Sequence, residues 1–192
     1  MAQIFESHCV RGADGKHSGG TDKQSNHRYG DAYDALFPDR DAIKLMLEVG
    51  IADGACLLAW RDIFPNAHIV GMDIHPCDAT TGKRPERLET HRGNQCSKED
   101  CERAAAGRQF DFIVEDAYHS VENTLLTLLW LWPFVKPGGL YVVEEWANIG
   151  GCMLNIKALW PDAQIISTPG PFGGDEPLVA FRKPKSEWHN PE

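Results

Sequence analysis

The chain has 192 residues and a formal net charge of -9, with 19 Lys and Arg against 28 Asp and Glu. A partner recognised through its phosphates normally meets a positive surface, so we expect no nucleic-acid partner. The hydrophobic share of 42% and the charged share of 24% are typical of a globular protein and argue against a disordered or fibrous one. At this length a single domain is expected.

Targeting and redox signals are weak. The N-terminus has no basic flank followed by a long apolar run, so no signal peptide is predicted. The most apolar segment, residues 125–135, is too short for a membrane span and contains Pro133. The six cysteines form no C-x-x-C pair, which favours free thiols over a zinc knuckle or a redox dithiol. We therefore expect a soluble, cytoplasmic protein with no membrane partner.

Short apolar runs alternate with helical segments along most of the chain. Residues 1–24 are rich in Gly, Ser, His and Lys without periodicity, and we predict a flexible arm there, followed by one domain over 25–192. The predicted helices are 26–36, 55–64, a helix capped by Ser97, 121–135 and 153–159. The predicted strands are 43–50, 67–72, 88–92, 110–114, 140–143, 163–167 and 178–181, with a long loop over 76–89. This alternation predicts a doubly wound α/β fold whose ligands bind at the carboxyl ends of the strands.

The first two predicted strands end in residues suited to a nucleoside. Glu48-Val49-Gly50 leads to Gly54, and glycines at such a turn let the backbone approach a ligand closely, although many glycine turns are only turns. Asp73 follows the next strand, about 20 residues on, where a carboxylate can bind a ribose diol. The spacing is not the G-x-G-x-x-G of a dinucleotide site. A nucleoside cofactor without a pyrophosphate is predicted, as in S-adenosylmethionine-dependent methyltransferases.

Four segments carry a closer resemblance. They are Gly20-Thr21-Asp22-Lys23 with His27 and Tyr29, Leu47-Glu48-Val49-Gly50 running to Asp73, Glu115-Asp116-Ala117-Tyr118-His119, and Pro137-Gly138-Gly139 running to Glu144-Glu145. Together they resemble the metal-dependent sugar O-methyltransferases of macrolide antibiotic biosynthesis, the mycinamicin type. The resemblance implies a class I, Rossmann-like fold with a seven-stranded, mostly parallel sheet and an antiparallel C-terminal edge hairpin.

The resemblance also implies a site. It assigns Asp116, Glu144 and Glu145 as magnesium ligands and His119, with Asp116, to catalysis. S-adenosylmethionine would be bound by Thr21, Lys23, Glu48, Gly50, Asp73, Asn94, Gln95 and Asp116, with Asp73 on the ribose, Asn94 and Gln95 near the adenine, and residues 21–23 over the methionine end. The family pair after the fifth strand is usually Glu-Asp, whereas this chain has Glu144-Glu145, whose second side chain is longer.

Elementary electrostatics supports a cation among these acidic residues. Carboxylates from adjacent strand ends repel one another unless protons or a cation neutralise them. Oxygen ligands suit magnesium or calcium, and a bound cation lowers the pKa of a hydroxyl group whose proton His119 could accept. The alternative, purely structural interpretations are that Glu144-Glu145 are solvated loop charges and that His119 caps the following helix.

The predicted activity is O-methylation of a small hydroxylated acceptor such as a sugar. Two alternatives stay open at this point: a cephalosporin hydroxylase-like protein, and a non-catalytic module that binds S-adenosylmethionine. The apolar stripe Leu125, Leu128, Leu129 and Trp132 is core or a dimer face, which leaves a homo-oligomer open.

Overall fold

The computed structural model describes residues 1–11, 13, 17–25, 27–75, 86–145, 164–168 and 178–185. The helices of this part are α1 (Ala2–Ser7), α2 (Gly30–Leu36), α3 (Ala55–Ile63), α4 (Lys98–Ala105) and α5 (Val121–Leu131), with short 3-10 helices at Arg40–Ala42 and Trp132–Phe134. The strands are β1 (Cys9–Arg11), β2 (His17–Gly20), β3 (Leu45–Val49), β4 (His68–Asp73), β5 (Leu88–Arg92), β6 (Phe110–Glu115), β7 (Val135–Val143), β8 (Gln164–Thr168) and β9 (Leu178–Arg182).

Seven of the described strands form one sheet in the order β5-β4-β3-β6-β7-β9-β8. Strands β5, β4, β3, β6 and β7 run parallel to one another. β9 pairs antiparallel with both β7 and β8, so the reversed strand is the second from the edge, and the edge strand β8 points the same way as β7. The predicted α/β fold with a mostly parallel sheet and an antiparallel edge hairpin is confirmed.

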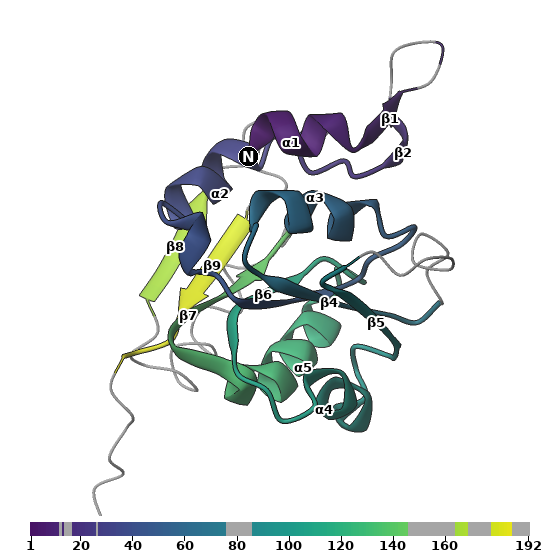
Figure 1. The fold of residues 1–192 in the computed structure, drawn as a ribbon. Helices are drawn as coiled ribbons and strands as arrows, with labels where there is room; N and C mark the ends of the chain where they lie inside the picture. Colours follow the sequence, from purple (N-terminus) through teal and green to yellow (C-terminus); the bar gives the residue numbers. More distant parts are fainter. Residues whose placement is uncertain are drawn as a thin grey trace, which may run out of the picture.

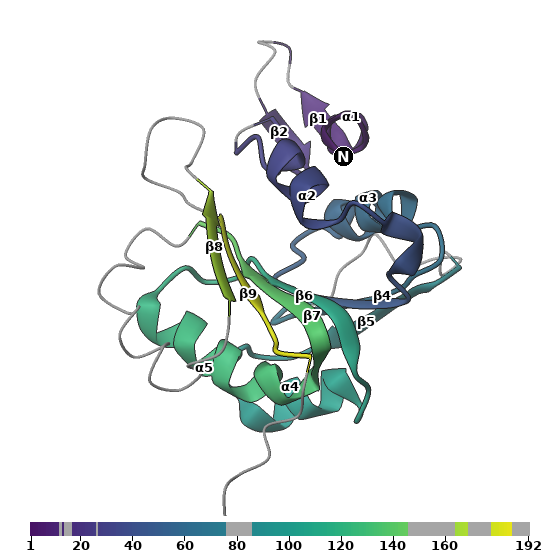
Figure 2. The same ribbon diagram turned by 90° about the vertical axis from the view of Figure 1, so that its left-hand side faces the viewer.

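Helices cover both faces of the sheet. Figures 1 and 2 show α1, α2 and α3 over one face and α4 and α5 over the other. Because successive strand residues point to opposite faces, each strand contributes to two cores. One core gathers Tyr33, Trp60 and Phe112 beneath α1 to α3, and the other gathers Leu128 and Tyr141 beneath α5.

The chain changes direction across the sheet between β3 and β6. It runs outward from β3 to β4 and β5, then returns to place β6 and β7 on the other side of β3. In open α/β sheets the crevice at such a switch point, outside the carboxyl ends of the strands, is where ligands bind. The loops after β3, β4, β6 and β7 are therefore the place to look for a site.

The N-terminal region differs from the predicted arm. It forms α1 and the antiparallel pair β1 and β2, and Met1 and Phe5 are buried in the core beneath α1 to α3. Phe5 packs edge-on against Trp60, with ring centroids 4.9 Å apart. Met1, Ile4 and Phe5 contact this core within little more than one helical turn, which is too short a run to stand out as a repeating apolar pattern in the sequence.

Other element boundaries differ for local reasons. The helix predicted over 121–135 ends as an α-helix at Leu131, because Pro133 has no N–H to continue the ladder, and a 3-10 turn follows. β7 begins at Val135, with an irregular register against β6 where Gly138 takes a φ of +81°. Ser97 caps α4 as predicted, its hydroxyl accepting the Asp100 N–H at 3.2 Å. The helix predicted over 153–159 and most of the loop predicted over 76–89 lie outside the described residues.

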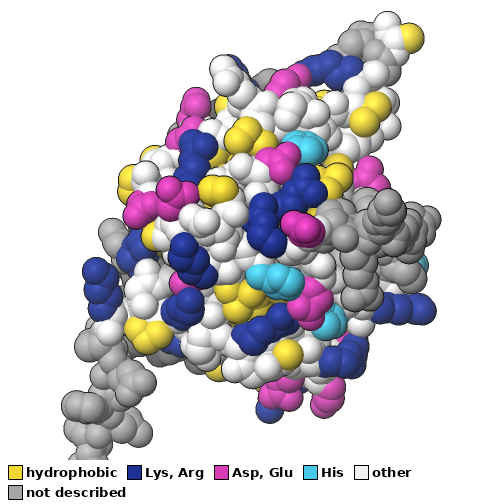
Figure 3. All heavy atoms as spheres, viewed as in Figure 1, with side chains coloured by type: hydrophobic (Ala, Val, Ile, Leu, Met, Phe, Trp, Pro, Cys, Tyr) yellow, Lys and Arg dark blue, Asp and Glu magenta, His cyan; other side chains and the backbone are white. Residues whose placement is uncertain are grey.

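Charges of both signs mix on the surface. On the face in Figure 3, Lys and Arg side chains alternate with Asp and Glu, and no broad field of one sign dominates it. None of the helices in the described part of the chain combines the length and the apolar character that crossing a membrane requires.

The packing of Phe5 gives a test of the N-terminal region. Phe5→Ala removes a ring that is 0% exposed, and it should lower the free energy of unfolding by about 3–5 kcal/mol because a cavity remains beside Trp60. Urea denaturation followed by tryptophan fluorescence measures this. Gln3→Ala, at an exposed position of the same helix, is the control and should change stability by less than about 0.5 kcal/mol. Equal stabilities of the two variants would contradict the packing.

Candidate functional site

Gly50 lets the ends of β3 and β6 approach each other closely. Its φ is +85°, and a Cβ atom there would lie 2.2 Å from the carbonyl oxygen of Asp116. Asp116 N donates to the Val49 carbonyl at 2.8 Å, and Gly50 N donates to the Met72 carbonyl at 2.8 Å. Gly54, with a φ of +82°, is the N-cap residue of α3. The predicted glycine turn is therefore a real junction between three strand ends.

Asp73 organises the same turn from the end of β4. Its Oδ2 accepts the backbone N–H groups of Ile51 and Ala52 at 2.9 and 3.0 Å. Its Oδ1 accepts the N–H of His75 at 2.9 Å. Both oxygens thus hold backbone around the cavity, a role that the sequence did not suggest. Ribose binding by Asp73 stays a prediction.

A cavity of about 510 Å³ opens at these strand ends. Its walls combine apolar side chains, including Ile51, Met72 and Ile74, with polar and charged ones, as a small-molecule site does. Its lining includes most of the predicted cofactor residues: Thr21, Lys23, Gly50, Asp73, Asn94, Gln95 and Asp116. Glu48 is not in the lining, because it is completely buried beneath the turn.

Gln95 and Asn94 take different positions in this cavity. The side chain of Gln95 is buried and braced: its Nε2 donates to Glu115 at 3.0 Å and to Thr127 at 3.1 Å, and its Oε1 accepts the Tyr118 N–H at 2.8 Å. Asn94 is exposed, and its Oδ1 accepts the Cys96 N–H at 2.9 Å. Gln95 therefore holds the loop after β6 in place, which the sequence did not indicate.

The side chain of Lys23 is buried among carboxylates. Its Nζ lies 2.7 Å from Asp116 Oδ2, 2.7 Å from Glu144 Oε2 and 3.1 Å from Glu48 Oε1. Burial acts to lower the pKa of Lys23, but the charges of the three carboxylates outweigh it and hold that pKa well above its usual value. Lys23 is therefore charged at neutral pH.

Glu144 belongs to this buried group. Its second carboxylate oxygen accepts a short hydrogen bond from the Tyr33 hydroxyl, and its side chain is 2% exposed. Burial raises the pKa of Glu144 well above its usual value. The sequence grouped Glu144 with Glu145 as metal ligands, but the structure turns Glu144 inward to Lys23 and Tyr33.

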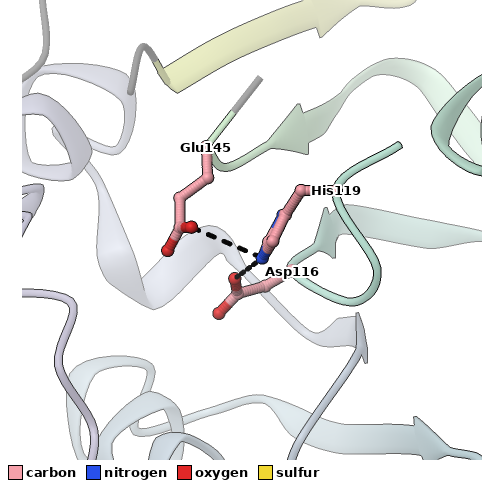
Figure 4. Close-up of side chains that lie close together, drawn as sticks. All are labelled: Asp116, His119 and Glu145. Atoms are coloured by element: carbon pink, nitrogen blue, oxygen red, sulfur yellow. Dashed lines mark ion pairs between the residues drawn. The ribbon is translucent and has the colours of Figure 1, made fainter. Parts of the chain in front are cut away.

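Asp116, His119 and Glu145 form a second group, which we call the outer cluster. Figure 4 shows the three side chains converging from the loops after β6 and β7. One ligand atom from each lies within 4.8 Å of the others. His119 Nε2 is 3.5 Å from Glu145 Oε2 and 4.0 Å from Asp116 Oδ1. Two carboxylates and an imidazole at this spacing can hold a divalent cation or pass a proton.

His27 supports the outer cluster from the N-terminal region. Its Nε2 lies 3.0 Å from Glu145 Oε1 and 3.3 Å from Asp22 Oδ2. The hydrogen bond with His27 lowers the pKa of Asp22 to about 2. Tyr29 stacks on the His27 ring, and its hydroxyl accepts the N–H of Glu145 at 3.3 Å. The sequence assigned no role to His27 or Tyr29 beyond the resemblance. Tyr29 and Glu145 are 116 residues apart in the chain, so no local pattern indicates this contact.

Comparisons with known proteins agree with this architecture. The chain is 30% identical over 139 residues to mycinamicin VI 2''-O-methyltransferase of Micromonospora griseorubida, covering 65% of this chain and 34% of that protein. It is 31% identical over 142 residues to demethylmacrocin O-methyltransferase of Streptomyces fradiae, covering 66% and 35%. The chain thus spans about a third of the length of these curated relatives. No protein-family model matches it.

A solved structure decides the fold. The structure of MycE methyltransferase from the mycinamycin biosynthetic pathway, in complex with Mg, SAH and mycinamycin VI, matches with a TM-score of 0.67 and 23% identity. The match covers 85% of this chain and 52% of that one. The chain has a class I methyltransferase fold. The resemblance to sugar O-methyltransferases predicted from the sequence is confirmed as well.

Two glycines of this methyltransferase fold allow a matched test of the junction. Gly50 and Gly107 both have positive φ, but a Cβ at Gly107 meets nothing within 4 Å. Gly107→Ala should therefore cost only the backbone strain, about 1–2 kcal/mol. Gly50→Ala should cost about 1–3 kcal/mol more, because the methyl group strikes the Asp116 carbonyl. Thermal unfolding compares them, and equal losses would mean that the approach of β3 to β6 is not tight.

Proposed function

We propose that this chain is an S-adenosylmethionine-dependent O-methyltransferase, assisted by a divalent cation, that acts on a hydroxyl group of a small acceptor such as a sugar. The observation that carries the proposal is the position of Asp116. This residue lies in the wall of the cavity and is also a member of the outer cluster. A cofactor in the cavity and an acceptor at the outer cluster would meet there. A sugar acceptor is supported by the names of other curated relatives, which act on a rhamnosyl or an olivosyl compound.

The residues around the cavity fit a nucleoside cofactor. The turn at Gly50 exposes backbone at the switch point of the sheet, and the cavity of about 510 Å³ falls in the range of small-molecule sites. Asp73 keeps carboxylate lone pairs for a diol, because each of its oxygens can accept more than one hydrogen bond. Asn94 and Ile74 also line this cavity. S-adenosylmethionine would supply the methyl group here.

The outer cluster fits a hard divalent cation. Asp116 and Glu145 offer carboxylate oxygens, the ligands that magnesium prefers, and His119 is close enough to act as the base. A magnesium ion there would lower the pKa of an acceptor hydroxyl. Glu144 would support the ion only indirectly, since its carboxylate is held by Lys23 and Tyr33. We therefore propose Asp116 and Glu145 as the ligands and His119 as the catalytic residue that accepts the proton.

The cofactor assignment is tested by calorimetry. Asp73→Ala should weaken S-adenosylmethionine binding at least about a hundredfold, because two charge-assisted hydrogen bonds are lost. Asp31→Ala, at an exposed position of α2, is the control and should bind like the unmodified protein. Circular dichroism checks that both variants are folded. Undiminished affinity in Asp73→Ala would overturn the assignment of Asp73.

Methyl transfer tests the activity and the ion. With labelled cofactor and a panel of sugars, EDTA should stop turnover and added magnesium should restore it. Glu145→Gln should need at least about tenfold more magnesium for half-maximal turnover, since one charged ligand is lost. If EDTA leaves turnover unchanged while Asp116→Asn destroys it, the cation is refuted but the role of Asp116 survives.

The same assay separates the alternatives raised by the sequence. A methyltransferase adds one methylene to the mass of the acceptor, a hydroxylase adds one oxygen, and a binding module shows no turnover. The comparisons favour neither alternative, since the relatives described above are methyltransferases. A cytoplasmic location, a homo-oligomer and the absence of a nucleic-acid partner stay predictions.

A further inference from the structure

The carboxylates at the strand ends divide into two groups around Asp116. Glu48, Asp116 and Glu144 surround the Lys23 ammonium, and we call them the inner carboxylates. Asp116, His119 and Glu145 form the outer cluster. Asp116 belongs to both, with Oδ2 directed to Lys23 and Oδ1 to His119. Cations can therefore be held on either side of this one side chain.

The inner carboxylates have the character of a cation site. Glu48 is completely buried, and its carboxylate lies 3.1 Å from the Lys23 ammonium. Glu144 is 2% exposed. Buried carboxylates that converge in this way are tolerated only with a positive charge among them. In this fold the charge is the Lys23 ammonium.

Several backbone contacts hold Lys23 in that place. Its carbonyl accepts the Tyr29 N–H at 2.8 Å, and the neighbouring Thr21 N–H donates to the His8 carbonyl at 3.1 Å. Thr21 is 4% exposed and Lys23 1% exposed. The segment that carries the ammonium is thus docked on the N-terminal elements, and the long side chain reaches inward to the strand ends.

We infer that the Lys23 ammonium occupies an inner cation site and thereby confines a divalent ion to the outer cluster. This inference rests on the proposed cation-assisted function and gives Lys23 a different role from the cofactor binding that the resemblance implied. Lys23 is then a positioning residue: it acts through Asp116, turning one carboxylate oxygen outward beside His119. The ion pair between Lys23 and Glu144 also explains why Glu144, although adjacent to Glu145, is not part of the outer cluster.

The test is to empty the inner site. Lys23→Met keeps a long side chain but removes the charge, so an added ion should enter among Glu48, Asp116 and Glu144. We expect this variant to bind Mn²⁺ at least about tenfold more tightly than the unmodified protein in calorimetry, because a repelling charge is gone. Magnesium should raise its melting temperature more than that of the unmodified protein. Methyl transfer should fall at least about a hundredfold even at saturating ion, because the ion then lies away from His119.

Matched variants keep the test decisive. Glu144→Gln retains Lys23 and the outer cluster, so it should bind Mn²⁺ no more tightly than the unmodified protein. If Lys23→Met does not fold, the double variant Lys23→Met, Glu144→Gln takes its place, because it removes one charge of each sign. The double variant should bind Mn²⁺ more tightly than Glu144→Gln alone. Equal or weaker Mn²⁺ binding after loss of Lys23 would overturn the inference. So would weaker S-adenosylmethionine binding with unchanged Mn²⁺ binding, which would return Lys23 to the cofactor.

The result also separates this inference from the proposed function. If the unmodified protein binds no Mn²⁺ and EDTA leaves turnover intact, the cation-assisted function fails, yet a new Mn²⁺ site in Lys23→Met would still support the inner site. If the unmodified protein binds Mn²⁺ and Lys23→Met binds it equally, the inference fails and the proposed function stands.

Discussion

The buried ion pairs of Lys23 connect the parts of this molecule that matter for its site. One ammonium meets carboxylates from the ends of β3, β6 and β7, and Tyr33 of α2 completes the group through Glu144. Desolvating these charges is costly, so the arrangement persists only because each negative group lies beside a positive or donating one. The N-terminal region that carries Lys23 is for this reason a structural part of the site.

A second constraint is the close approach of two strand ends at Gly50. Because no side chain separates the turn from the Asp116 carbonyl, the loop after β6 lies directly against the loop after β3. The cavity opens beside this junction, and Asp116 faces both the cavity and the outer cluster. The proposed cofactor and acceptor regions are adjacent because of this contact, as in-line transfer of a small group requires.

Much of the fold followed from local patterns. The strand over Leu88–Arg92 has the predicted bounds, and Ser97 caps α4 as predicted, because apolar runs and capping residues act within a few positions of the chain. The prediction of an N-terminal arm was wrong, since the burial of Phe5 depends on its contact with Trp60, about 55 residues away in the chain. The helix ending at Leu131 and the early start of β7 were missed because Pro133 and the following glycines admit more than one local structure.

The sequence by itself determined the order of elements, the doubly wound class and the concentration of carboxylates at one edge, because these depend on periodicity and on residues that end strands. It also placed Asp116, His119 and Glu145 near one another. Only the tertiary structure decided which acidic residues contact Lys23 and which belong to the outer cluster. Glu144 and Glu145 are neighbours in the chain, yet one turns inward to Lys23 and the other outward to His27 and His119. Both residues follow the last residue of β7, and Glu145 has a positive φ of +53°, so the backbone turns between them. Which side holds the balancing charge depends on a segment more than 100 residues earlier.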